Sequence, residues 1–97
     1  MIKHIVLWKI KEEKKSEILN AKATLLSMEN KVPEVKAIQV GIDFLHSNRS
    51  YDLVLEVLLD DETSLNRYQI DDYHVNVVKK LMNEIQEKVV TIDYYLE

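Results

Sequence analysis

The 97-residue sequence has no cysteine, one glycine and one proline. The lack of cysteine excludes a disulfide framework and a thiol nucleophile, and a reducing compartment is the simplest interpretation. So little glycine and proline argues against linkers and disordered tails. No apolar run is long enough to span a membrane, and Met1 leads directly into a predicted strand with no room for a signal peptide. We therefore expect one cytoplasmic domain over residues 1–97, without membrane association.

The charged residues of the sequence do not predict a surface dominated by basic side chains. The chain has 13 basic and 17 acidic residues, for a net charge of −4. Nucleic-acid-binding proteins usually present a clustered basic face. The lysines near residues 9–15 are interleaved with Glu12, Glu13 and Glu17, which is typical of a solvated helix start. We expect no nucleic-acid partner.

Hydrophobic periodicity predicts four strands and three helical segments. The strands are expected over 1–11, 35–43, 51–59 and 88–96, and the helices over 13–31, 60–70 and 71–85. Pro33 ends the first helix, and Asp71 can cap the last one. The order βαββαβ predicts an α+β, ferredoxin-like fold, in which a four-stranded antiparallel sheet carries its helices on one face.

Both faces of the predicted sheet carry apolar residues. In the first strand, alternation places Ile2, His4, Val6, Trp8 and Ile10 on one face, which we assign to the helix side. The second faces are also apolar, with Ile5, Leu7, Ile38, Val40, Ile42, Val54 and Leu58. A sheet covered on one side needs only one apolar face. We expect a homodimer with sheets packed face to face, since the loops are too short to cover the second face themselves.

Three polar side chains are predicted to face the interior. His74 shares a helical stripe with Val78, and Tyr68 precedes the break at Asp71, so both can reach one cavity with His4. Imidazole exchanges protons near neutral pH, and a phenol can hold a carbonyl oxygen as charge develops. The set suits enolisation or aldol-type cyclisation. The alternative is that all three are hydrogen-bonded core residues.

Metal and cofactor sites have no support in the sequence. His4, His46 and His74 are far apart, without the paired spacing of metal ligands, and nothing requires Glu34 to join a cation site. There is no glycine-rich phosphate loop and no nucleotide fingerprint. We expect no metal and no cofactor.

Several segments together resemble the stress-responsive A/B barrel (Dabb) family over nearly the whole chain. They are Met1-Ile-Lys-His-Ile-Val-Leu-Trp-Lys9, Tyr51-Asp-Leu-Val-Leu-Glu-Val57, Tyr68 with His74-Val75, and Val90-Thr-Ile-Asp-Tyr94. The resemblance implies a ferredoxin-like fold and a homodimer whose two sheets form a barrel. The wider superfamily includes monooxygenases, isomerases and haem-degrading enzymes. One plant member is a polyketide cyclase that uses a His and a Tyr for aldol cyclisation; these correspond to His74 and Tyr68, and its N-terminal strand histidine to His4.

The sequence departs from the family at two places. The usual His-Pro-x-His-Val reads Asp71-Asp-Tyr-His-Val75, and a further pocket histidine of the cyclase is replaced by Leu53. The predicted pocket, which Trp8, Leu53 and Val78 are expected to line, is therefore less polar. We expect a homodimer that binds a small, partly apolar molecule. The alternative is a cofactor-independent enzyme, cyclase, isomerase or monooxygenase-like, with His74 as base, Tyr68 as donor and His4 as orienting group.

Overall fold

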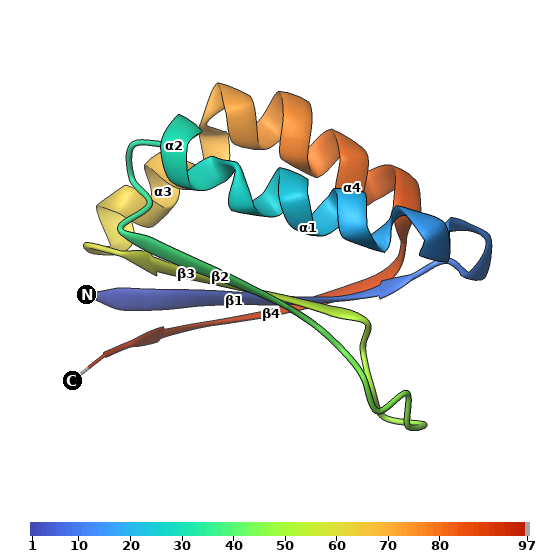
Figure 1. The fold of residues 1–97 in the computed structure, drawn as a ribbon. Coiled ribbons are helices and arrows are strands. Elements are labelled where there is room, and N and C mark those ends of the chain that lie inside the picture. The colour runs from blue at the N-terminus through green and yellow to red at the C-terminus, as the bar shows by residue number, and fades with distance from the viewer. Residues whose placement is uncertain (97) are drawn as a thin grey trace.

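A computed structural model describes residues 1–96 as an α+β, ferredoxin-like fold, as predicted (Figure 1). One antiparallel sheet is covered on one face by the helices, and its other face is open. The strands are β1 (Ile2–Ile10), β2 (Ala37–Ile42), β3 (Leu53–Leu59) and β4 (Gln86–Tyr95). The helices are η1 (Glu12–Glu17, 3-10), α1 (Ile18–Leu26), α2 (Met28–Lys31), α3 (Glu62–Ile70), η2 (His74–Lys79, a π-helix) and α4 (Lys80–Ile85). Within the described residues, no helix has the length and apolarity to cross a membrane.

The N-terminal strand β1 lies at the centre of the sheet, whose order is β2-β3-β1-β4. It pairs antiparallel with β3 on one side and with β4 on the other. The register sets His4 opposite Val57 and Asp93. Residues that are directly opposite in antiparallel strands lie on the same face of the sheet. Because β4 pairs antiparallel with β1, the start of β1 lies beside the end of β4.

Alternate residues of β1 and β3 are buried under the helices, as the period of two predicts. Those of β1 are Ile2, His4, Val6, Trp8 and Ile10. From the helical side, Ala21, Leu25 and Met28 pack into the same core. His4 is therefore on the helix side, where the sequence placed it.

The helix-facing residues of β2 differ from the prediction. Ile38 pairs with Val57 and Val40 with Leu55, and both partners are buried under the helices. Ile38 and Val40 therefore pack against the core rather than on the open face. The open face of β2 carries Ala37, Gln39 and Gly41 instead. The predicted apolar open face is correct for β1 and β3 but wrong for β2.

The predicted helix over 13–31 is divided into η1, α1 and α2. The interruption between α1 and α2 lies at Ser27. Its hydroxyl donates to the Thr24 carbonyl at 2.5 Å and lies 2.6 Å from the Tyr73 hydroxyl. The segment ends at Val32, which is extended (φ −113°, ψ 108°), as expected for a residue before proline.

Asp71 separates α3 from the next helical segment, as predicted. Its backbone is non-helical, and its carboxylate accepts hydrogen bonds from the backbone N–H groups of Tyr73 (2.9 Å) and His74 (3.1 Å). The segment continues as the π-helix η2 rather than as an α-helix. Because a π turn holds more residues than an α turn, the buried stripe reaches Met82, and Leu81 is only partly buried.

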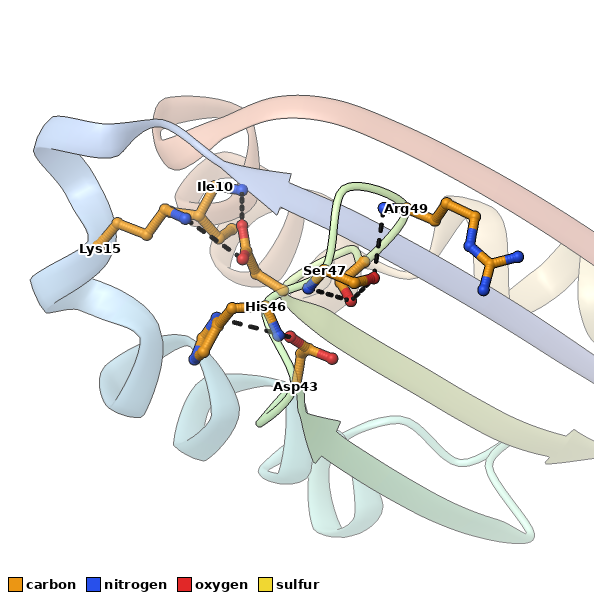
Figure 2. A network of polar contacts seen from close by, with 8 residues as sticks. Ile10, Lys15, Asp43, His46, Ser47 and Arg49 are labelled. Carbon is orange, nitrogen blue, oxygen red and sulfur yellow. Dashed lines mark hydrogen bonds and ion pairs between the residues drawn. The ribbon is translucent and has the colours of Figure 1, made fainter.

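The Asp52 carboxylate connects the end of β1 to the start of β3. Ile10 donates its backbone N–H to Asp52 Oδ2 at 2.7 Å, and Lys15 Nζ donates to Oδ1 at 3.3 Å. Figure 2 shows both nitrogens directed at this one carboxylate. Ile10 lies beyond the last β1–β3 pair, Trp8 with Leu53, so the side chain takes the place of a ladder partner.

Replacing Asp52 by Ala should lower the free energy of unfolding by about 1–3 kcal/mol, because the buried N–H of Ile10 loses its acceptor. Asp52→Asn retains an acceptor oxygen and should lose less. Urea denaturation followed by circular dichroism measures both variants against the wild type. Equal losses for the Ala and Asn variants would contradict the role of the acceptor.

Candidate functional site

A cavity of about 360 Å³ lies between the helices and the covered face of β1 and β4. His4, Tyr68 and His74 line it together, although they come from three separate elements. Its apolar wall consists of Val6, Trp8, Leu25, Leu55, Val78, Met82 and Val89. Polar groups from Gln69, Lys79, Asn83, Gln86, Thr91 and Asp93 complete the lining. The cavity is therefore apolar in its body and polar in part of its wall.

The Tyr68 ring packs against both imidazoles. Its centroid is 4.4 Å from that of His74, with the planes tilted by 34°, and 5.5 Å from that of His4 in an edge-to-face arrangement. The break at Asp71 makes this possible, because it ends α3 just after Tyr68 and starts a new helical segment at His74. The rings hold one another in place by packing.

His4 is oriented by a carboxylate. Its Nδ1 lies 2.5 Å from Asp93 Oδ1, a contact that joins β1 to its neighbour β4. The Asp93 carboxylate is an acceptor, so it accepts a hydrogen bond from the Nδ1–H of His4 and fixes the orientation of the ring. The His4 side chain is buried, whereas Asp93 is partly exposed.

His74 has a ring nitrogen without a partner. The residue is only 8% exposed, and no group in residues 1–96 forms a hydrogen bond with its buried Nδ1. Burial lowers the pKa of His74; the charges of Lys79 and His4 act in the same direction, while a hydrogen bond to the Gln69 backbone and the charge of Asp71 oppose it. His74 is therefore neutral at pH 7.

The Tyr68 hydroxyl is fully buried and has a weak acceptor. It donates to the thioether sulfur of Met28 at 3.7 Å. Burial, with the negative charges of Asp71 and Asp93, raises the pKa of the Tyr68 phenol, which stays protonated across the physiological range. The site thus contains the neutral imidazole of His74, whose Nδ1 has no hydrogen-bond partner among the described residues, and the neutral phenol of Tyr68, whose hydroxyl donates to a weak sulfur acceptor.

Two of the three expected pocket residues line the cavity, and one does not. Trp8 and Val78 form part of the wall, but Leu53 is absent from it. Leu53 pairs with Trp8 and Ile42, on the β2 side of β1, whereas the cavity opens toward β4. Leu55, two residues further along the same face of β3, lines the cavity instead.

The sequence did not single out Asp93 or Lys79 as site residues. Asp93 lies between Ile92 and Tyr94 in the mostly apolar segment 89–95, and a lone carboxylate in that segment is a usable signal. Its partner is identified only by the β1–β4 register, which sets it opposite His4. Lys79 looks like an ordinary exposed helix residue. No three His, Asp or Glu side chains within residues 1–96 are grouped to hold a metal ion.

Comparison with solved structures gives the same fold at low sequence identity. A dimeric protein of unknown function from Bacteroides fragilis is 24% identical, with 98% of this chain and 95% of that chain covered and a TM-score of 0.84. A dimeric ferredoxin-like protein from Thermobifida fusca is 21% identical over 98% and 90%, at 0.85. A hydroxynitrile lyase from Passiflora edulis is 18% identical over 99% and 93%, at 0.86.

The family of the chain follows from its sequence together with this fold. No curated protein was found to match the sequence. The model of the stress responsive A/B barrel domain matches residues 2–96, nearly the whole chain. The β1 histidine, the Tyr68–His74 segment and the closing strand, on which the resemblance rested, all fall within that match. The chain therefore belongs to the stress responsive A/B barrel (Dabb) family.

Proposed function

We propose that the protein binds a small, partly apolar molecule in the cavity between sheet and helices. The observation that carries this proposal is the cavity of about 360 Å³, which His4, Tyr68 and His74 line together. Imidazole and phenol groups can form hydrogen bonds with a ligand that carries a hydroxyl, carbonyl or N–H group.

The cavity wall supports a ligand with an apolar body. Val6, Trp8, Leu55 and Val78 offer an apolar surface, and the volume of about 360 Å³ lies at the small end of ligand sites. Polar groups such as Gln69 and Thr91 offer hydrogen bonds at other points of the lining. The ligand chemistry that fits is a compact hydrocarbon or aromatic skeleton bearing one or two oxygen functions.

A second candidate function is proton transfer without a cofactor, favoured by the protonation states of the site. Neutral His74 can accept a proton at its unprotonated ring nitrogen from a carbon acid or hydroxyl. Tyr68 can redirect its O–H from the weak sulfur acceptor to a carbonyl oxygen, and His4, held by Asp93, orients the tyrosine ring. The Passiflora relative is a hydroxynitrile lyase, so this fold supports an enzyme in at least one protein.

We also propose that the functional form is a homodimer through the open sheet face. That face presents large apolar residues from three strands, including Ile5, Leu7, Val54, Val90 and Ile92. Contiguous exposed apolar surface of this kind marks interaction sites. The Bacteroides and Thermobifida relatives with the same fold are described as dimeric.

Compounds that bind the cavity should lose affinity when His74 is replaced by Ala. A screen of small ketones, phenols and aromatic carbonyl compounds, followed by thermal shift and calorimetric titration, identifies binders of the wild type. Loss of one hydrogen bond should weaken them by roughly tenfold. His46→Ala, which removes an exposed loop histidine, is the matched control and should bind as the wild type does. Equal affinity of all three proteins would remove His74 from the site.

The lowered pKa of His74 should make the fold sensitive to acid. In the unfolded chain His74 binds a proton near pH 6.5, whereas the folded imidazole does so only at lower pH. The unfolded state therefore binds more protons in this window, and stability falls as pH falls below about 6.5. NMR titration of the ring protons should give His74 a pKa below 6.5. His74→Gln should lose less stability on acidification, and a His74 pKa at or above 6.5 would contradict the desolvated site.

The wild type should sediment as a dimer at micromolar concentration. Ile92→Lys, on the open face beside Ile5, should shift it toward monomer, because the packed face would bury an unpaired charge. Ile70→Lys on exposed α3 is the control and should remain dimeric. A monomeric wild type would refute the homodimer.

A further inference from the structure

The loop between β2 and β3, residues 43–52, extends past the open face of the sheet, on the side away from the helices (Figure 1). It carries two large apolar side chains in solvent. Phe44 is 88% exposed and Leu45 67%. Such exposure next to an already apolar face enlarges one continuous apolar surface rather than adding an isolated residue.

The loop is held in one conformation by its own polar groups (Figure 2). Asp43 Oδ2 accepts the His46 backbone N–H at 2.7 Å, and the hydroxyls of Ser47 and Ser50 lie 2.8 Å apart. Ser50 also donates its N–H to the Ser47 carbonyl at 3.1 Å. His46 takes φ 55°, an uncommon conformation for a residue with a side chain. Phe44 and Leu45 thus lie in a loop of fixed conformation, which lowers the conformational entropy lost when they bind a partner.

A groove of about 450 Å³ separates this loop from the open face of the sheet. Its loop side includes Phe44, Arg49 and Tyr51, and its sheet side is formed by Leu7, Gly41, Ile42, Leu53 and Val54. Gly41 keeps the floor open, because a Cβ at this position would lie 3.0 Å from Val54 Cγ1. The groove is mainly apolar and is continuous with the face proposed for dimerisation.

The two edges of the open face are complementary in size. At one edge β2 presents Ala37, Gln39 and Gly41, and at the other edge β4 presents Val90, Ile92 and Tyr94. Stacking β2 on its own copy would leave voids, and stacking β4 on its own copy would crowd large side chains. A two-fold axis parallel to the strands places β2 of one copy over β4 of the other, so that small residues meet large ones.

We infer that the β2–β3 loop clasps the second copy of this chain, with Phe44 and the groove receiving β4 of that copy. The inference rests on the homodimer proposed above. Gly41, Val54, Leu7 and Val90 form one row across the sheet. A two-fold axis along the strands preserves the level of each row, so the partner's Val90 lies over the groove. Each copy clasps the other, and the contact occurs twice.

Sedimentation equilibrium of Phe44→Ser tests the clasp. The dimer dissociation constant should rise by about tenfold or more, as for a buried aromatic anchor of an interface. Phe44 is exposed in the single chain, so the substitution should leave thermal unfolding of the monomer unchanged. Leu19→Ser, which removes a residue of 75% exposure from α1, is the matched control and should dimerise as the wild type does.

A double-mutant cycle identifies the partner of Phe44. Within one chain Phe44 and Val90 lie at opposite edges of the sheet, so they couple only across an interface. Combined with Val90→Ser, Phe44→Ser should increase the dissociation constant by less than the product of the two single effects. A dimeric wild type with an unaffected Phe44→Ser variant overturns the clasp alone, and independent effects overturn its placement on β4. A monomeric wild type overturns both the clasp and the homodimer.

Discussion

The antiparallel pairing of β1 with two neighbours at once is the constraint on which the rest of the molecule depends. It turns the first ten residues into the centre of the sheet and fixes which side chains of β3 and β4 share each face. One register therefore determines the hydrophobic core, the open face and the position of His4. A slip by one residue would expose the core and bury the lysines of β1.

The same register explains how a small core accommodates several polar rings. Removing imidazole and phenol groups from water is unfavourable unless they find partners. His4 finds one in Asp93, because antiparallel pairing places the two side by side at the cavity. The Tyr68 hydroxyl donates to the Met28 sulfur, and Nδ1 of His74 has no hydrogen-bond partner among the described residues. The incomplete hydrogen bonding of Tyr68 and His74 thus occurs at the cavity that both side chains line.

The sequence predicts what short-range patterns determine. Alternation in β1, the stop before Pro33 and the cap at Asp71 depend on neighbouring residues, and each is found in the structure. The missed features depend on contacts between distant segments. The face of Ile38 and Val40 is decided by pairing with β3, and the cavity wall reaches Leu55 rather than Leu53 because β4, not β2, borders it. The π-helix η2 has no local signature in the sequence.

The His4–Asp93 contact joins residues 89 positions apart in a chain of 97. Chain segments with such separation meet only after most of the loop-closure entropy has been overcome. During synthesis His4 is made 89 residues before its carboxylate partner, which arrives with β4. The site is thus absent from every nascent chain that lacks β4. The order of synthesis itself delays the complete cavity until β4 has been made. Chains that lack β4 carry β1 with an unpaired edge and His4 without the carboxylate that orients it.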